Sequence, residues 1–164
     1  MATTSLPLTE DDTSEILYCA RAGEATDLAA YLAALAAQHG STPGVVLLAA
    51  TDPETGNTPL HYACANGHAD LAAQLLSAPL CPSPEYVNTP NRAGNTPLHW
   101  AALNGHLPVV KVLLDHGADA GVLNAAGHDA VFEAEMNDRG EVVEFMLREV
   151  EELERAFGGG EGEG

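Results

Sequence analysis

Histidine is the residue whose number and spacing first suggest chemistry in this sequence. Two pairs with the same separation stand out among the seven histidines, His61 with His68 and His99 with His106. An imidazole can hold a metal ion or transfer protons near neutral pH. Both pairs, however, lie in nearly identical segments, GNTPLHYACANGH and GNTPLHWAALNGH. We predict no metal site at these histidines.

The cysteines and carboxylates form no catalytic pattern. Three cysteines, an odd number without a CxxC spacing, argue against both a disulfide framework and a thiolate zinc site. Cys19 and Cys64 stand where the other copies have alanine, so we expect buried, inert thiols. Glu133 and Glu135 could exchange protons, but nothing in the sequence places a substrate beside them. Since GK[ST], GxSxG and HExxH are also missing, we predict a protein that is not an enzyme and needs no cofactor.

Charge indicates which kind of partner this chain could bind. It carries 24 acidic and 6 basic residues, a formal net charge of -18. A nucleic-acid surface needs clustered lysine or arginine, so direct binding to nucleic acid is not expected. A basic protein partner fits the same charge, because opposite charge speeds and selects encounters. The sequence also has no apolar stretch long enough to span a bilayer and no leader-like start, so we expect no membrane role.

Local signals predict that each repeated segment forms a pair of helices. Thr58 and Thr96 can cap a first helix, the proline that follows each suits its first turn, and Gly67 and Gly105 end it. A second amphipathic pattern follows each segment, with Leu71, Ala72, Leu75 and Leu76 in one copy and Val109, Val110, Leu113 and Leu114 in the other.

The TPLH and NGH elements of these segments resemble the ankyrin repeat, a turn followed by two antiparallel helices and a loop. The resemblance implies that the TPLH histidines, His61 and His99, hydrogen-bond to turn backbone and join neighbouring repeats. Two degenerate copies follow by alignment, one starting at Gly127 with Asp129 as its cap and one with Ser14 as its cap. Terminal repeats are expected to be atypical because one face meets water. We therefore predict an all-α ankyrin-repeat solenoid of about four helix-turn-helix units.

The repeats are unevenly spaced, which predicts long insertions. We place repeats near 13–40, 55–79, 93–120 and 126–157, within an ankyrin domain of residues 13–157. Between the first two, Ser41-Thr42-Pro43 could cap a short helix from Val45 to Ala50. The proline-rich stretch 77–92 reads as a second, smaller insertion. We expect residues 1–12 to be a flexible acidic N-terminus and 158–164 a disordered tail of glycine and glutamate.

The aligned copies also predict a binding surface, here called the recognition strip. Ankyrin arrays bind partners through their loop tips and the outer positions of their first helices. The strip comprises Asp11, Asp12, Tyr18, Asp52, Glu54, Tyr62, Asn66, Trp100, Leu103, Asn104, Asp129, Glu133, Glu135 and Met136. An acidic rim around an apolar centre would suit a cationic helix or tail. Aromatic residues occur both at binding hot spots and where helices stack, so both roles stay open for Tyr62 and Trp100.

A narrower resemblance rests on three segments, ILYCARAGE, LHWAALNG and AGHDAVFEAE. They are similar to a fungal family of small acidic ankyrin proteins that are dedicated chaperones of the small-subunit ribosomal protein S-three. The resemblance implies binding to the basic N-terminal region of newly made S-three, which is kept soluble until it joins the 40S precursor. It also implies action in cytoplasm and nucleus, and we expect a monomer when free. The alternative is a general ankyrin scaffold or signalling adaptor for another basic or apolar partner.

Overall fold

A computed structural model describes residues 6–158, and within that range the regular secondary structure is helical. Short helices of seven to nine residues alternate with connecting loops in the middle of the chain, and longer helices lie at both ends. The elements are α1 (Glu10–Ala22), α2 (Ala25–Gln38), α3 (Pro43–Ala49), α4 (Pro59–Ala65), α5 (Ala69–Leu75), a 3-10 helix η1 (Pro84–Asn88), α6 (Pro97–Leu103), α7 (Leu107–Asp115), α8 (Ala130–Met136) and α9 (Gly140–Gly158).

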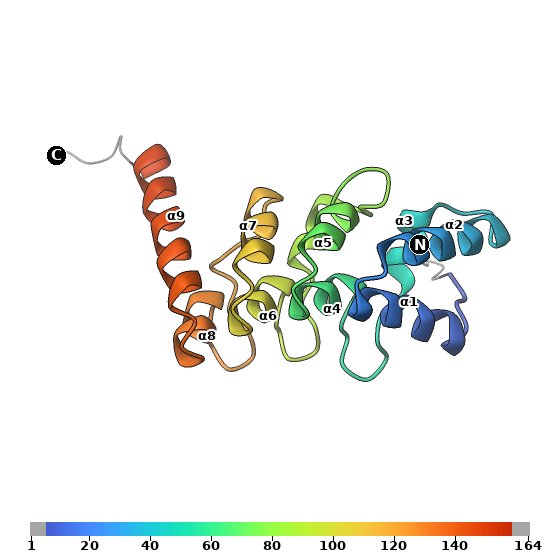
Figure 1. Cartoon of the computed structure of the whole chain (residues 1–164), viewed down its shortest axis with the longest axis horizontal. Coiled ribbons are helices and arrows are strands. Elements are labelled where there is room, and N and C mark those ends of the chain that lie inside the picture. The colour runs from blue at the N-terminus through green and yellow to red at the C-terminus, as the bar shows by residue number, and fades with distance from the viewer. Residues whose placement is uncertain (1–5, 159–164) are drawn as a thin grey trace, which may run out of the picture.

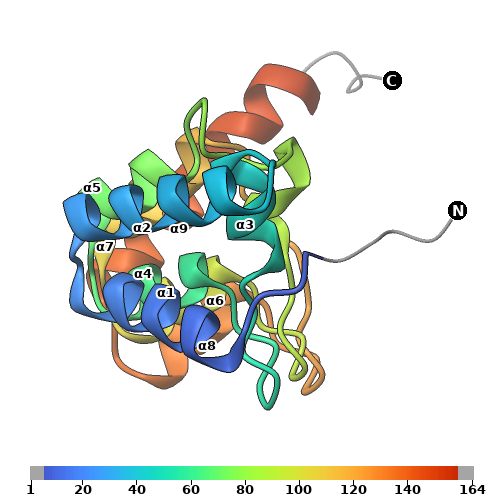
Figure 2. The same cartoon turned by 90° about the vertical axis from the view of Figure 1, so that its right-hand side faces the viewer.

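Four helix pairs stand side by side in chain order and form an elongated row (Figure 1). The view along the row shows two layers, with α1, α4, α6 and α8 in one and α2, α5, α7 and α9 in the other (Figure 2). The loops that precede α4, α6 and α8 project together beyond one edge of the first layer. This architecture confirms the predicted all-α ankyrin solenoid of four helix-turn-helix units.

The first helices begin and end where the sequence signals place them. The Thr58 hydroxyl accepts a hydrogen bond from the His61 backbone N–H at 3.3 Å, and Pro59 occupies the first turn of α4. Gly67 and Gly105 follow α4 and α6 with φ of 80° and 75°, a left-handed conformation that glycine adopts without a Cβ clash. Helices α4 and α6 are thereby limited to seven residues each, and the chain turns into the antiparallel second helix of the repeat.

The core runs the whole length of the row between the two layers. The TPLH leucines Leu60 and Leu98 are at most 1% exposed. Cys19 and Cys64 are buried at the small positions of the first helices, as predicted, and burial raises the pKa of both thiols. The neutral thiol is therefore the stable form, which suits packing and not nucleophilic chemistry.

The N-terminal prediction needs a correction. The first helix begins at Glu10 and not after a cap at Ser14, because Thr9 is the N-cap. The Thr9 hydroxyl accepts from the Asp12 N–H and the Asp12 carboxylate accepts from the Thr9 N–H, both at 3.0 Å. This reciprocal capping box makes residues 10–12 helical instead of flexible. Residues 1–5 lie outside the described range, as do residues 159–164 of the predicted tail, whereas Gly158 belongs to α9.

The secondary structure of one insertion was predicted from the sequence, and that of the other was not. The predicted short helix is present as α3, and Thr42 is its N-cap. The proline-rich insertion, for which no helix was predicted, contains η1 and buries Tyr86 and Val87, each 2% exposed, against the core. Proline spacing carries no periodic pattern, so the sequence did not reveal that this segment contributes to the core.

The described helices differ in length and in apolar content. None of them by itself is both long enough and apolar enough to cross a bilayer. Taken as a pair, α2 and α3 reach that length and composition, but they are bent by 100° at the break between them.

Candidate protein-binding surface

His61 uses both ring nitrogens to join two repeats. Its Nδ1 accepts a hydrogen bond from the Thr58 backbone N–H at 3.1 Å, so the ring proton is on Nε2. Nε2 donates to the carbonyl oxygen of Asn95 in the next repeat, 2.8 Å away. Burial lowers the pKa of His61 to about 4, although the bond to Asn95 opposes that shift. The ring is therefore neutral at physiological pH and has no nitrogen free for a metal.

His99 repeats this arrangement one unit later. Its Nδ1 accepts from the Thr96 backbone N–H at 3.0 Å, and its Nε2 donates to the His128 carbonyl oxygen at 3.0 Å. The structural role that the resemblance implied for the TPLH histidines is thereby confirmed at both positions. Since both rings fasten the loop of the following repeat, they position the surface that the loops build.

The second histidine of each segment points in the opposite direction along the chain. The Nε2 of His68 donates to the Arg21 carbonyl oxygen at 2.8 Å, and the Nε2 of His106 donates to the Ala65 carbonyl oxygen at 3.0 Å. In the last repeat Arg139 takes this role, since its Nε donates to the Leu103 carbonyl oxygen at 3.0 Å. Arg139 was not among the residues predicted to join repeats. Its position, one residue after Asp138, nevertheless aligns with the histidines of the NGH elements.

Three loop tips lie side by side and form the edge of the surface. We call residues 51–57, 91–95 and 124–128 the first, second and third fingers. The Arg92 N–H donates to the Thr55 carbonyl oxygen, and the Ala125 N–H donates to the Ala93 carbonyl oxygen, each at 2.9 Å. One backbone hydrogen bond therefore joins each finger to the next, which makes the fingers a continuous ledge beside the first helices.

Tyr62 and Asp52 are brought together by the first finger. The Tyr62 hydroxyl donates to Asp52 Oδ2 at 2.6 Å, and the guanidinium of Arg21 lies 4.5 Å from the centre of the Tyr62 ring. The hydrogen bond from Tyr62 lowers the pKa of Asp52, and bonds from the Glu54 and Thr55 N–H groups act in the same direction against burial. Tyr62 thus links finger, helix and preceding repeat, which supports the stacking role for this aromatic residue.

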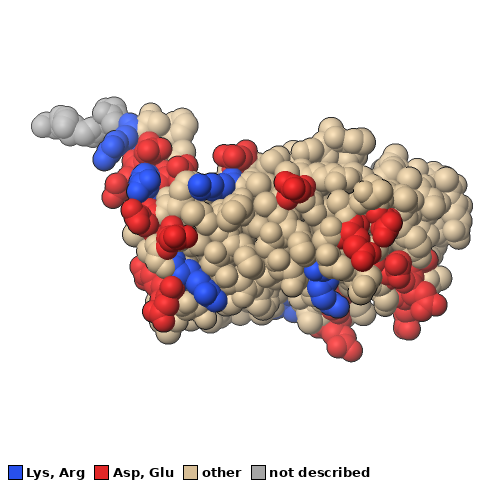
Figure 3. All heavy atoms as spheres, viewed as in Figure 1, with Lys and Arg blue, Asp and Glu red and all other residues tan. Residues whose placement is uncertain are grey.

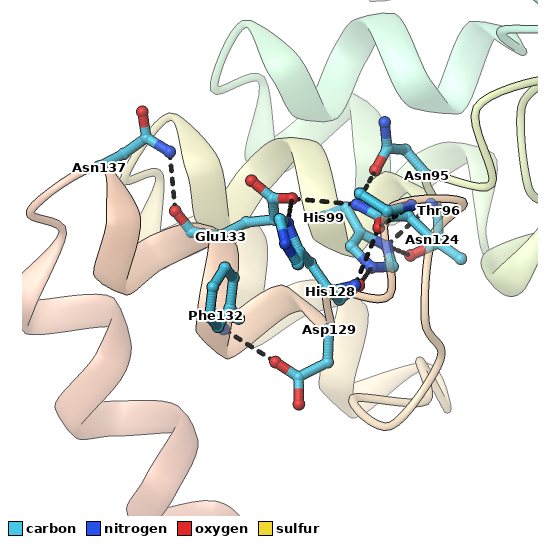
Figure 4. A network of polar contacts seen from close by, with 10 residues as sticks. Asn95, Thr96, His99, Asn124, His128, Asp129, Phe132, Glu133 and Asn137 are labelled. Carbon is cyan, nitrogen blue, oxygen red and sulfur yellow. Dashed lines mark hydrogen bonds and ion pairs between the residues drawn. The ribbon is translucent and has the colours of Figure 1, made fainter.

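Glu133 occupies the equivalent position of the last repeat and is held in the same way (Figure 4). Its Oε1 accepts from Asn124 Nδ2 at 3.0 Å and from His128 Nδ1 at 2.9 Å. Burial raises the pKa of Glu133, but the hydrogen bonds from His128 and Asn124 outweigh this and lower it. The His128 ring lies 4.1 Å from that of Phe132. The carboxylate therefore stabilises the third finger and is only partly available to a partner.

The strip residues around Trp100 fall into two groups, asparagines that bond to helix ends and apolar side chains that are half-buried. Asn66 Nδ2 donates to the Tyr62 carbonyl oxygen at 2.8 Å, and Asn104 Nδ2 donates to the Ala65 carbonyl oxygen at 3.1 Å, so both amides support helix ends. Trp100 and Leu103 are half-buried. The Trp100 indole N–H is buried without an acceptor among the described residues. Because the ring is half-buried and tryptophan is enriched at interfaces, the binding role for Trp100 stays open.

The remaining predicted residues divide into exposed and internally engaged groups. Tyr18 and Met136 are 53% and 66% exposed at opposite ends of the strip. Asp11, Glu54 and Glu135 are also exposed. Asp12 and Asp129 instead cap helices, with Asp129 Oδ1 accepting from the Phe132 N–H at 2.8 Å. The hydrogen bonds from Thr9 and Tyr31 lower the pKa of Asp12.

The expected acidic rim is discontinuous. The second finger carries Arg92 and no acidic residue, whereas ten of the 24 acidic residues lie between 129 and 158. On the face shown in Figure 3, acidic side chains gather at the two ends of the row, and few charges lie in the middle. Within the recognition strip the acidic residues therefore lie toward its two ends, at 11–12 and 52–54 and at 129–135, and the second finger between them carries only the basic Arg92.

Comparison with known proteins agrees with this geometry. A family model for ankyrin repeats in three copies matches residues 32–124 and 80–155. The chain is 37% identical to the ankyrin repeat-containing protein YAR1 of Saccharomyces cerevisiae over 150 residues, which are 88% of this chain and 72% of YAR1. It also matches a chain in the crystal structure of the yeast ribosomal protein Rps3 in complex with its chaperone Yar1, with a TM-score of 0.78 and 36% identity over 87% of this chain and 95% of that one. The chain therefore belongs to the ankyrin-repeat family and is a relative of yeast YAR1.

Proposed function

We propose that this chain is a chaperone of ribosomal protein Rps3, which it binds and keeps soluble until Rps3 joins the 40S precursor. The observation that carries the proposal is the similarity to the yeast chaperone Yar1, at 36–37% identity over almost nine tenths of the chain. Ankyrin arrays are protein-binding scaffolds. In this proposal the protein therefore acts by binding alone, without catalysis and without a cofactor.

The charge of the chain supports a basic client. A ribosomal protein that lies on RNA is basic, and when free it associates with cellular polyanions. A chain with a net charge of -18 attracts such a client and competes for its RNA-facing surface. We propose that the basic N-terminal region of Rps3 is the segment that is bound, since a basic segment that lies along the strip can meet the acidic residues at both ends.

The exposed members of the recognition strip, together with the half-buried Trp100 and Leu103, are proposed as the contact residues. Tyr18, Trp100 and Leu103 would cover apolar parts of the client, with Met136 at the far end. Asp11, Glu54 and Glu135 are exposed, and their side-chain carboxylates accept no hydrogen bond from the described residues, so these carboxylates can meet cationic side chains. Tyr62, Asp52 and Glu133 are proposed to support the surface from within.

Purified proteins test the proposal directly. Rps3 alone should precipitate at low salt, whereas Rps3 mixed with this chain should stay in solution and elute as one complex on size-exclusion chromatography with light scattering. The same measurement on the chain alone should give a monomer. A complex whose affinity does not fall between low and high salt would favour an apolar adaptor and contradict an electrostatic chaperone.

Two triple variants with equal charge change separate specific contacts from net charge. The test variant is Asp11→Asn/Glu54→Gln/Glu135→Gln, and the control is Asp70→Asn/Glu85→Gln/Asp115→Asn, which changes exposed carboxylates outside the recognition strip. We expect the test variant to lose about tenfold or more in affinity for Rps3, and the control to lose much less. Equal losses would mean that only the overall charge matters.

We further propose that the nascent subunit releases the client. RNA has a higher density of negative charge than this surface, so it should win the competition for basic side chains. Added ribosomal RNA should free Rps3 from the complex in a concentration-dependent way, and a complex that resists excess RNA would contradict this. Release at the nuclear precursor requires the chain in both cytoplasm and nucleus, which imaging of the tagged protein would test.

A further inference from the structure

An apolar groove lies at the C-terminal end of the row, where it shares Asp129 and Glu135 with the recognition strip. It has a volume of about 980 Å³ and lies between α8, α9 and the loop after α7. Its apolar lining comes from Val131 and Phe132 on α8 and from the exposed side of α9. No following repeat covers this face among the described residues, and α9 rises past the neighbouring α7 (Figure 1).

Helix α9 exposes a stripe with heptad spacing along the groove. Met146, Val150, Leu153 and Phe157 follow one another at intervals of four, three and four residues, which is the spacing of a helix-packing seam. Met146 is buried against the core, whereas Leu153 and Phe157 are 56% and 84% exposed. The first half of the stripe is therefore used by the fold, and the second half is free to receive another helix.

The edges of the groove are uniformly acidic. Asp119, Asp129, Glu135, Glu149 and Glu154 line it, and no lysine or arginine does. Arg148, on the same helix, forms an ion pair with Glu144, with Nη2 and Oε1 3.0 Å apart. An apolar stripe between two acidic edges is complementary to an amphipathic helix whose apolar stripe is flanked by lysine or arginine.

We propose that this groove docks an amphipathic helix of a basic partner protein, as a second binding site that adjoins the recognition strip at Asp129 and Glu135 and has its apolar part outside the strip. The helix would lay its apolar stripe on Val150, Leu153 and Phe157 and direct its cationic side chains to the carboxylates of the edges. A second copy of this chain fits less well, because Glu149 and Glu154 flank the α9 seam and would meet the same carboxylates of the other copy.

A designed peptide tests the groove without relying on Rps3. The probe is a fluorescently labelled helix of about 18 residues with leucine at the a and d positions of its heptads and lysine beside them. Its affinity for the full chain is measured by fluorescence anisotropy. The test variant is Leu153→Ser/Phe157→Ser. The matched control is Val45→Ser/Leu48→Ser, which removes two exposed apolar side chains from α3.

The proposal expects the test variant to weaken probe binding by about tenfold or more, while the control variant binds as the unaltered chain does. A probe with the same lysines but a scrambled apolar pattern should bind much more weakly, as should a probe with glutamate in place of lysine. Equal binding by the test and control variants, or by the scrambled probe, would overturn it.

Two further outcomes are diagnostic. Self-association of the unaltered chain in sedimentation velocity, lost in Leu153→Ser/Phe157→Ser, would assign the groove to a second copy and refute a basic helix as its occupant. Binding of Rps3 to the same two variants is measured in parallel. Unchanged Rps3 binding beside a lost probe signal supports two separate sites, whereas failure of the Rps3 proposal leaves the probe result standing.

Discussion

The ring of His61 donates a 2.8 Å hydrogen bond to the backbone carbonyl oxygen of Asn95, a residue 34 positions later in the second finger. The same bond recurs from His99 to His128, whose carbonyl belongs to the third finger. Each bond is part-buried and couples the start of one first helix to the loop that begins the next repeat. The ledge of fingers is thus held by the rings of His61 and His99 and by the backbone hydrogen bonds between neighbouring fingers.

The low pKa of His61 predicts acid sensitivity. The unfolded chain takes up this proton near pH 6.5, whereas the folded chain takes it up near pH 4. The contribution of neutral His61 to folding stability is therefore fully present above pH 6.5. It is lost as the pH falls toward 4, and the loss is roughly 3 kcal/mol in total. His61→Gln cannot protonate, so its stability should lack this loss. Urea unfolding at a series of pH values measures both proteins.

At pH 7.5 we expect His61→Gln to be less stable than the unaltered chain by roughly 1 to 3 kcal/mol, because the Asn95 carbonyl loses its partner. The difference between the two proteins should shrink as the pH falls. A difference that stays constant from pH 7.5 to 4 would show that protonation of His61 is not coupled to unfolding. His116, which is exposed, supplies the control substitution His116→Gln.

Gly23 should tolerate a side chain far less than Gly117. Both have positive φ, 77° and 90°, but a Cβ on Gly23 would lie 2.6 Å from His68 Nδ1, whereas nothing lies within 4 Å at Gly117. Gly117→Ala should cost about 1 to 2 kcal/mol for its backbone conformation. Gly23→Ala should cost at least about 1 kcal/mol more, since the displaced ring loses its bond to the Arg21 carbonyl. Thermal unfolding of both variants gives the comparison, and equal losses would refute it.

The adjacent leucines of α7 should differ in their contribution to stability. Leu113 is fully buried and Leu114 is half-buried beside the C-terminal groove. Leu113→Ala should lower the free energy of unfolding by roughly 2 to 5 kcal/mol, because it leaves a cavity in the core. Leu114→Ala should cost clearly less, since its site can collapse or fill with water. Chemical denaturation with unchanged m-values tests this order, and a larger loss for Leu114→Ala would contradict it.

Two tyrosines of the recognition strip should separate binding from folding. Tyr18→Ala is expected to weaken Rps3 binding by about tenfold without changing the melting temperature, because this ring is exposed. Tyr62→Ala is expected to destabilise the fold by roughly 1 to 3 kcal/mol, since it removes the bond to Asp52 and the contact with Arg21. Calorimetric titration and thermal melts on the same samples distinguish the two. The reverse pattern would exchange their roles.

Glycine positions show why the central repeats were predictable from sequence and the terminal ones less so. Gly67 needs both a positive φ and room for the His106 ring, 2.9 Å from where its Cβ would be. Asp138 occupies the same position in the last repeat with φ 57°. No further repeat packs on it among the described residues, so only the backbone conformation remains to be satisfied, and aspartate can adopt it. The motif therefore weakens at the end of the row because its neighbour contact is missing.

The resemblance to the ankyrin repeat implied the role of the TPLH histidines, and the local signals of the sequence determined the helix pairs and the caps of α4, α6 and α8. They did so because capping, glycine turns and hydrophobic periodicity act over a few residues and recur in each repeat. Tertiary structure alone decided that Tyr86 enters the core, that Arg139 substitutes for a histidine, and that Tyr62, Asp52 and Glu133 are tied within the fold. Tyr86 and Arg139 pack on or bond to segments far from them in the chain, and the bonds of Tyr62, Asp52 and Glu133 depend on the folded shape of a neighbouring loop. Neither follows from the local pattern of residues. The same reason explains the divided acidic surface and the groove beside α9.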